Sequence, residues 1–258
     1  LPTQKFMEYL KFRNANGAAQ STVKNEVTQI RKMFRFATKS GYVPRDYAPE
    51  FPKLPSNTQP YAGGTVGRRS EFSLDEWTEL CDYLEDWHKR AEDDEDLYAR
   101  KLVRLFILIG CFSGLRVSEM KMLKWSMIDF PKDDASKVII RVPPYGKTGA
   151  RRVRPFDGTA DLLRELKEEA AYSEPHDFLF VDSETRKFLS GRRFYALWHL
   201  AMKDTKLDQT DKDLQYGSLR HTYCTFCLYD RISPMLVSQN MGTGLVQIQK
   251  HYAHISTD

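Results

Sequence analysis

The chain has 258 residues, of which 41% are hydrophobic and 29% are charged, and its formal net charge is +4. This length suits two domains, and this composition is that of a folded globular protein, which excludes a disordered chain. No apolar run reaches the ~18 residues that a membrane-spanning helix needs, and no secretory signal peptide is visible, so we expect no membrane partner.

The charge is distributed unevenly along the chain. Residues 1–57 hold ten Lys/Arg and four Asp/Glu, a net of +6, which leaves 29 basic and 31 acidic residues, a net of −2, for the remainder. A small basic domain beside a near-neutral larger one indicates that the first domain binds a polyanion. We expect a helical domain at residues 1–57, a linker at 58–70 and a second domain at 71–258. Because the chain begins at Leu1, we also expect an N-terminal module to be missing.

The N-terminal region is expected to be helical. Phe6 to Phe12 suggests a short helix, Asn14–Gly17 a turn, and a longer helix runs from Ser21 to Gly41. Its apolar residues recur at three- and four-residue spacing: Val23, Val27, Ile30, Met33, Phe34 and Ala37. Basic residues occupy its other faces. Such residues are usually only solvated, but their density here favours phosphate contacts by Lys24, Arg31, Lys32 and Arg35.

The linker is rich in Pro and Gly and loses all periodicity. It ends at Arg68 and Arg69, which we also predict to contact DNA. Ser73, three residues before Glu76, then predicts a capping box that opens the first helix of the second domain.

The second domain carries three segments of chemical interest. A strongly apolar stretch, residues 102–111, predicts a buried helix, and Arg116 follows near the start of the next one. Alternating residues at 138–142 and 152–154 predict a β-hairpin whose loop exposes Lys147 between two glycines. A third segment, residues 214–228, predicts a helix that carries Arg220, and Tyr252 stands near the C-terminus.

Each of these residues also has an ordinary interpretation. Arg116 can pair with Glu119, Lys147 can be a simple hairpin lysine, and Tyr252 is one of thirteen tyrosines. Together, however, two guanidiniums and a phenol are what an enzyme needs to hold a DNA phosphodiester and attack it without a metal. Guanidiniums bind phosphate through paired hydrogen bonds that lysine cannot form, and lysine can donate a proton to an alkoxide.

The chain resembles the tyrosine recombinases, the phage-type integrase family, over nearly its whole length. The resemblance is carried by Ser113-Gly114-Leu115-Arg116-Val117-Ser118-Glu119, by Ser218-Leu219-Arg220-His221-Thr222, and by the spacing from Gly242 to His251-Tyr252-Ala253-His254. It implies a mainly α fold with a small antiparallel β-sheet, in which a helical core-binding domain precedes an α+β catalytic domain. It also implies that the missing module is an arm-type DNA-binding domain.

The resemblance implies site-specific DNA recombination, the integration or excision of a mobile element, through a 3′-phosphotyrosyl intermediate. Its catalytic residues fall on Arg116, Lys147, Arg220, Thr243 and Tyr252. The implied partners are double-stranded DNA at core-type attachment sites and three further copies, in a homotetramer on two duplexes. No metal or other cofactor is implied, and the implied location is the cytoplasm of a bacterial host, at the nucleoid.

Two positions depart from the family pattern. Gly217 stands where the family has a histidine, and Thr243 stands where it has histidine or tryptophan. Thr243 can still donate one hydrogen bond, and His221 or Tyr216 could replace the missing histidine. Two alternatives therefore remain: a type IB topoisomerase-like enzyme, which relaxes DNA without strand exchange, and a non-catalytic DNA-binding relative.

The four cysteines, Cys81, Cys111, Cys224 and Cys227, lie in hydrophobic or aromatic surroundings without a disulfide-like framework. Cys224 and Cys227 form a C-x-x-C, but no second pair supports a zinc site, so we predict that these two are buried thiols.

Overall fold

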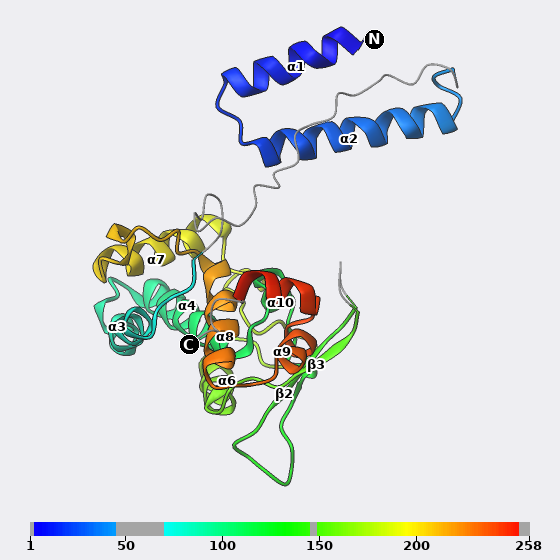
Figure 1. Cartoon of the computed structure of the whole chain (residues 1–258). Coiled ribbons are helices and arrows are strands. Elements are labelled where there is room, and N and C mark those ends of the chain that lie inside the picture. Colours follow the sequence, from blue (N-terminus) through cyan, green and yellow to red (C-terminus); the bar gives the residue numbers. More distant parts are fainter. Residues whose placement is uncertain (1–2, 45–69, 145–148, 253–258) are drawn as a thin grey trace. The chain divides into compact units, whose positions relative to one another are not determined.

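The computed structural model describes residues 3–44, 70–144 and 149–252. The chain divides into two compact units, Leu1–Thr65 and Val66–Asp258. Helices dominate both units, and the second also contains a three-stranded antiparallel sheet (Figure 1). The predicted fold class, mainly α with a small antiparallel sheet, is confirmed. The predicted linker, except Ser70, lies outside the described residues, and so do Arg68 and Arg69.

The described part of the first unit is a pair of helices, α1 (Thr3–Ala15) and α2 (Gln20–Lys39). Val23 and Val27 of α2 are buried, each 2% exposed. A polar contact joins the helices, because Glu26 accepts hydrogen bonds from Tyr9 Oη at 2.9 Å and from Arg13 Nε and Nη2 at 3.0 and 2.7 Å. Met33 was predicted to belong to the apolar stripe, and this is wrong: its side chain is 69% exposed.

The predicted DNA-contacting residues of α2 share one side of the helix. Lys24, Arg31, Lys32 and Arg35 are all exposed. At ~100° per residue they fall within an arc of about 100°, next to the apolar stripe but not on it. The helix therefore presents a basic face, and the contact of this face with DNA stays a prediction.

The second unit is built from short elements around one long helix. Its α-helices are α3 (Leu74–Glu85), α4 (Asp94–Ser113), α5 (Val117–Met120), α6 (Thr159–Glu169), α7 (Gly191–Asp204), α8 (Tyr216–Tyr229), α9 (Pro234–Met241) and α10 (Leu245–Tyr252). Its 3₁₀ turns are η1 (Trp87–Arg90), η2 (Trp125–Met127) and η3 (Leu207–Gln209). Its strands are β1 (Ile128–Asp129), β2 (Ile139–Val142) and β3 (Arg151–Val153).

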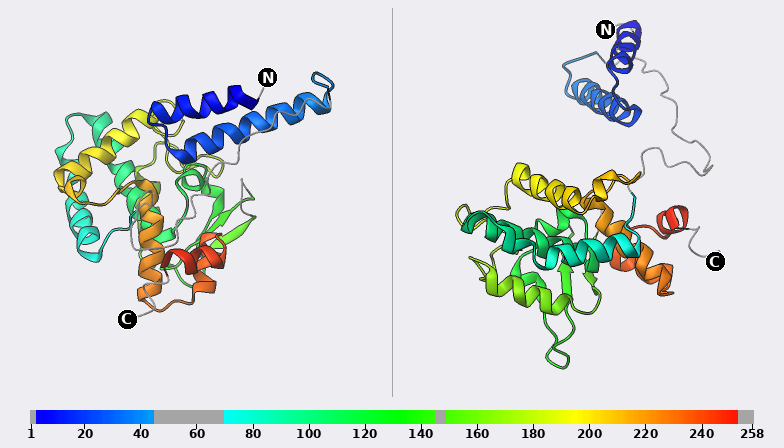
Figure 2. Two further views of the ribbon diagram at one scale, coloured as in Figure 1. Left: turned by 45° about the horizontal axis from the view of Figure 1, so that its top comes forward. Right: turned by 90° about the vertical axis from the view of Figure 1, so that its left-hand side faces the viewer.

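Helix α4 is the centre of this unit and contacts η1, α5, α6, α7 and α8. Figure 2 shows the ribbon in two further views. It begins where the Asp93 side chain accepts the Asp96 N–H at 2.7 Å, and three acidic residues in its first turn favour a helix N-terminus. The predicted buried stretch 102–111 is confirmed, since every residue of α4 from Leu105 to Cys111 is buried. No helix in the described ranges is long and apolar enough to cross a membrane.

The predicted capping box that opens α3 is also confirmed. The Ser73 hydroxyl accepts the Glu76 N–H at 3.2 Å, and the Glu76 carboxylate accepts the Ser73 N–H at 2.7 Å. Phe72, just before it, donates its N–H to Thr222 Oγ1 of α8 at 2.9 Å, so the first residues of this unit attach directly to the helix that carries Arg220.

The predicted hairpin forms strands β2 and β3, with Ile140 opposite Val153. Strand β1 pairs with the other side of β2, where Ile128 lies opposite Ile140. Strand β3 is therefore an edge of the sheet. Lys147 belongs to the loop between β2 and β3 and lies outside the described residues.

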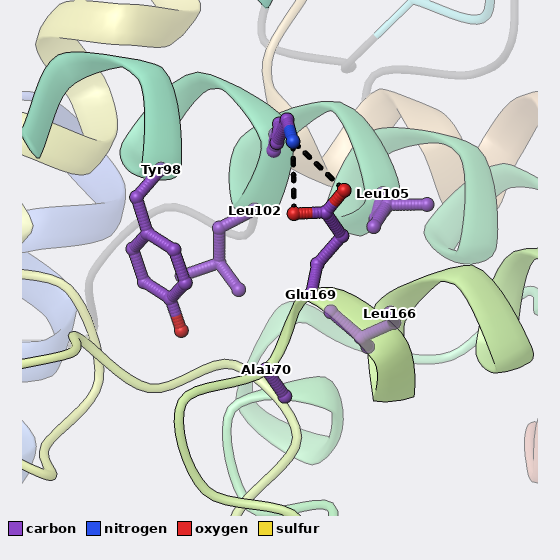
Figure 3. A pocket seen from close by; sticks show the side chains of 7 residues that line it. Tyr98, Leu102, Leu105, Leu166, Glu169 and Ala170 are labelled. Atoms are coloured by element: carbon purple, nitrogen blue, oxygen red, sulfur yellow. Dashed lines mark hydrogen bonds and ion pairs between the residues drawn. The ribbon is translucent and has the colours of Figure 1, made fainter. Parts of the chain in front are cut away.

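A small surface depression lies between α4 and α6 and is lined by Tyr98, Leu102, Leu105, Leu166 and Ala170 (Figure 3). Lys101 Nζ of α4 donates to both oxygens of Glu169 at 2.7 and 2.8 Å, so an ion pair spans it (Figure 3). This depression joins two helices and contains none of the predicted catalytic residues.

Replacing Gly114 with Ala is expected to destabilise the protein by about 2 kcal/mol or more. Gly114 ends α4 at φ +64°, and an added Cβ would lie 2.3 Å from the Tyr223 ring. Gly191 is the matched control, since a Cβ there meets no atom within 4 Å and it lies in the first turn of α7. Thermal unfolding should show a lower midpoint for Gly114→Ala and an equal or higher one for Gly191→Ala. Equal midpoints for both variants would contradict this.

Candidate active site

Arg116 is the N-cap residue of helix α5 and follows the turn that ends α4 at Gly114. Its backbone N–H donates to Glu119 Oε2 at 2.9 Å, which fixes the start of the helix. Its guanidinium donates to Glu119 Oε1 at 2.9 Å and, through Nη2, to the Gly242 carbonyl at 2.8 Å. The side chain is 35% exposed. A guanidinium has five N–H donors, so these bonds leave donors that a ligand can engage.

Arg220 reaches the same place from helix α8. Its Nη1 donates to the Gly114 carbonyl at 2.6 Å, two residues before Arg116 in the chain. Tyr223, one turn further along α8, packs its ring against Gly114. Arg220 therefore binds the turn between α4 and α5, two residues before Arg116, although the two arginines are far apart in sequence. Guanidiniums favour an anion carrying several oxygens, such as a phosphate.

Glu119 binds the guanidiniums of both Arg116 and Arg151. Its side chain is 7% exposed, and Arg151 of β3, whose side chain is 9% exposed, forms a paired ion bridge with it. Arg151 Nη1 lies 3.0 Å from Oε1, and Nη2 lies 2.7 Å from Oε2. One buried carboxylate thus contacts two guanidiniums and one backbone N–H.

The turn after helix α9 completes the described part of the site. Gly242 adopts φ +62°, and an added Cβ would lie 2.9 Å from the Arg151 side chain, so glycine is favoured here both by the backbone conformation and by the space available. Arg151 Nε donates to the Asn240 carbonyl at 2.9 Å, while Arg116 holds the Gly242 carbonyl. Thr243 is half-buried beside this contact, and its N–H donates to the Ser238 carbonyl at 3.0 Å.

Tyr252 is the last residue of helix α10, and its side chain lies outside the described residues. The helix follows the Thr243 turn and packs on α9. Ile248 of α10 is buried in a small cluster with Tyr223, Cys227, Val237 and Met241. The helix that carries Tyr252 is therefore anchored to the helix that carries Arg220.

Tyr216 and His221 were the two residues predicted as possible replacements for the family histidine at Gly217, and the structure excludes Tyr216. Tyr216 is 2% exposed, its ring stacks on Phe194 with centroids 3.9 Å apart, and its hydroxyl donates to the Phe194 carbonyl at 2.9 Å. Burial raises the pKa of Tyr216 well above its usual value. Tyr216 is a core residue, which leaves His221, next to Arg220 and half-buried, as the remaining candidate.

All four cysteines are free thiols. Cys224 and Cys227 are buried, as predicted; Cys111 is also buried, whereas Cys81 is partly exposed. Burial raises the pKa of Cys81 and of Cys227 to about 12. Among the described residues, His, Cys, Asp and Glu side chains form no group of three or more that could hold a metal ion.

Arg151 and Asn240 were not predicted from the sequence, and Glu119 was predicted only as a partner of Arg116. A signal for Arg151 was present. Side chains alternate along a strand, so Arg151 lies on the same face of β3 as the buried Val153, while Arg152 between them is exposed. A buried arginine requires an acidic partner. Asn240 had no comparable signal, because its contacts are all with distant segments.

Glu119 is expected to make the stability of the protein depend on pH. Burial opposes its ionisation, but hydrogen bonds from Arg151 and from the Arg116 N–H lower its pKa from 4.5 to about 2. Because the pKa of Glu119 is lower in the folded than in the unfolded protein, its ionised carboxylate stabilises the fold at any pH above about 4.5. This contribution is lost as the pH falls from about 4.5 to about 2. The contribution is on the order of 3 kcal/mol.

The measurement compares the free energy of unfolding of wild type and Glu119→Gln between pH 7 and pH 2.5. Subtracting the two curves removes the titration of the other carboxyls. The wild type should be more stable at pH 7, and the difference should shrink as the pH falls below about 4.5. A difference that does not change with pH would show that the Glu119 charge contributes nothing.

Comparisons with known proteins identify the family and the fold. The model of the phage integrase family matches residues 75–258. The fold is similar to that of the XerH site-specific recombinase bound to its difH substrate, with a TM-score of 0.69 and 18% identity over 98% of this chain and 68% of that one. It is also similar to the Tn1549 transposon integrase in complex with circular intermediate DNA, with a TM-score of 0.66 and 14% identity over 100% and 83% of the two chains.

A lambda integrase dimer bound to a COC′ core site is a third similar structure, with a TM-score of 0.61 and 16% identity over 96% of this chain and 80% of that one. A search of curated protein sequences gave no match. The matched family model covers more than two thirds of the chain, including Arg116, Arg220 and Tyr252. The chain therefore belongs to the phage integrase family, the tyrosine recombinases.

Proposed function

We propose that this protein cuts and rejoins DNA at a specific site, as part of the integration or excision of a mobile element, with Arg116, Lys147, Arg220, Thr243 and Tyr252 as its catalytic residues. The observation that carries the proposal is a pair of hydrogen bonds: Arg220 binds the Gly114 carbonyl in the turn that leads to Arg116, and Arg116 binds the Gly242 carbonyl just before Thr243. Family membership supports the same reaction.

In the proposed mechanism, the Tyr252 oxygen attacks the scissile phosphate. A bond forms between the tyrosine oxygen and phosphorus, and the bond from phosphorus to the 5′ oxygen breaks. Lys147 protonates the departing 5′ oxygen, and a nearby base such as His221 accepts the tyrosine proton. Because one phosphoester replaces another, the 5′ hydroxyl of a second cut strand can reverse the step without an outside energy source.

Arg116 and Arg220 stabilise the transition state in this mechanism. Negative charge grows on the non-bridging oxygens as phosphorus becomes five-coordinate, and fixed donors aimed at that charge are the largest single source of rate in many enzymes. Hydrogen bonds to Gly114, Glu119 and Gly242 hold the two guanidiniums in place before the substrate arrives. Thr243 donates one further hydrogen bond to a phosphate oxygen.

The proposed partners are double-stranded DNA with core-type sites and three further copies of the chain, arranged on two duplexes. The exposed basic face of α2, with Lys24, Arg31, Lys32 and Arg35, supports phosphate contacts by the first unit. In this proposal the protein acts at the nucleoid of a bacterial host.

The test begins with a library of random duplexes, each nicked so that a cut strand loses its short end and cannot be rejoined. Sequencing of the DNA that stays bound after denaturation identifies the site. Two intact duplexes with that site are then incubated with the protein. We expect a covalent adduct on the nicked duplex and recombinant strands from the intact pair.

Other outcomes identify the alternatives. Covalent adducts with relaxation of a supercoiled plasmid, but without recombinant strands, would favour the topoisomerase-like activity. Tight DNA binding without any adduct would favour the non-catalytic relative and would make Gly217 and Thr243 losses of function. The family match and the recombinase folds of the similar structures do not favour either alternative.

A further inference from the structure

Asn240, near the end of helix α9, pairs with the outer edge of the sheet. Its Oδ1 accepts the Arg154 N–H at 2.7 Å, and its Nδ2 donates to the Arg154 carbonyl at 3.1 Å. Arg154 directly follows β3, whose other side is taken by β2. One carboxamide thus takes the place of a neighbouring strand and attaches α9 to the end of β3.

The same carboxamide also contacts helix α8. Its Nδ2 donates to the Tyr223 hydroxyl at 2.6 Å. Tyr223 is 4% exposed, packs against Phe156 with ring centroids 4.8 Å apart, and closes over Gly114, whose carbonyl holds Arg220. The side chain of Asn240 therefore joins the strand edge to the helix that carries Arg220.

The main chain of Asn240 is held as well. Its carbonyl accepts a hydrogen bond from Arg151 Nε at 2.9 Å, and Arg151 is bound through Glu119 to Arg116. Thr243 follows Asn240 by three residues, about one helical turn. The carboxamide and the main-chain carbonyl of Asn240 already form hydrogen bonds within the protein, so we do not expect either group to bind the substrate.

We propose that Asn240 is a positioning residue for the cleavage reaction, which holds the Thr243 hydroxyl in register with the guanidiniums of Arg116 and Arg220. This inference rests on the proposed function. It assigns Asn240 no contact with DNA. A displacement of about 1 Å between reacting groups can cost ~100-fold in rate, so the loss of three hydrogen bonds at this junction should be visible in catalysis.

The test measures single-turnover cleavage of the nicked duplex selected from the random library, at saturating full-length protein. Asn240→Ala should slow adduct formation by about 10- to 100-fold and leave DNA affinity within about 2-fold. Gln239→Ala is the matched control, since Gln239 is the exposed neighbour on the same helix, and it should cleave at the wild-type rate.

A double-mutant cycle separates positioning from a general loss of structure. If Asn240 acts through Thr243, Asn240→Ala should cost less than about 3-fold once Thr243 is already Ala. Tyr223→Phe removes only the hydroxyl partner and keeps the buried ring, so it serves in the same cycle if Asn240→Ala does not fold. Its expected loss is smaller, about 3- to 10-fold.

Each outcome decides the proposal. Equal cleavage by Asn240→Ala and wild type, or equal fractional losses with and without Thr243, would overturn it. A wild type that forms no adduct would instead be the failure of the proposed function. Losses that shrink in the Thr243→Ala background would establish Asn240 as a positioning residue.

Discussion

Replacing Tyr252 with Phe is expected to abolish the covalent adduct between protein and DNA. Phe keeps the ring but removes the oxygen that would bond to phosphorus, and no other group is assigned that role. Loss of the nucleophile should lower the cleavage rate by at least about 10⁴-fold, while DNA binding remains. The measurement is adduct formation on the nicked duplex, resolved on a denaturing gel, with binding followed separately by fluorescence anisotropy.

Tyr229→Phe is the control for this experiment. Tyr229 ends helix α8, is 66% exposed, and lies within the same domain, so its variant should form adduct as wild type does. An adduct that persists in Tyr252→Phe would mean that another residue attacks the phosphate. The assignment of Tyr252 would then be wrong even though the family membership stands.

Replacing Arg220 with Lys is expected to slow cleavage by about 100-fold or more. Arg220 both holds the Gly114 carbonyl and, in the proposed mechanism, binds a phosphate oxygen. A planar guanidinium has several N–H donors in fixed directions, so it can bind the carbonyl and the phosphate oxygen at the same time. The lysine ammonium is a compact point charge without that fixed geometry. The charge is kept in this variant, so long-range attraction of DNA should change little, and the loss should appear in the rate at saturating protein.

Arg231→Lys provides the matched control, because Arg231 is exposed in the turn that follows α8. It should cleave within about 2-fold of wild type, as surface substitutions usually do. A rate for Arg220→Lys close to that of Arg231→Lys would show that charge alone is sufficient at position 220. In that case the requirement for a guanidinium at position 220 would have to be abandoned.

Much of the fold was predictable because its signals are local. The capping residues Ser73 and Glu76, the apolar run of α4 and the alternation of β2 and β3 each depend on residues a few positions apart. Met33 shows the limit of this reasoning, since an apolar residue at nearly the right spacing can still face solvent. Helix α2 has one partner helix in the described part of its unit, and one partner buries only a narrow stripe.

The candidate site was predictable only in part. Arg116 and Arg220 were found because their flanking residues resemble a family, and the structure places both at the Gly114 turn. The exclusion of Tyr216 could not be predicted, because a tyrosine at the start of a helix can point to a site or into the core. Only the packing of α7 on α8, with Phe194 stacked on that ring, decides between them.

The sequence by itself determined helices α1, α2, α3, α4 and α8, the hairpin and the basic first unit, and its resemblance to a family supplied the candidate catalytic residues. The tertiary structure decided how the arginines are held. Glu119 lies 32 residues before Arg151, and Asn240 lies 86 residues after Arg154, yet each forms short hydrogen bonds with its distant partner. Such contacts leave no periodic trace in a sequence, because a buried carboxylate or carboxamide selects its partner by where the folded chain places a donor, and not by its distance along the chain.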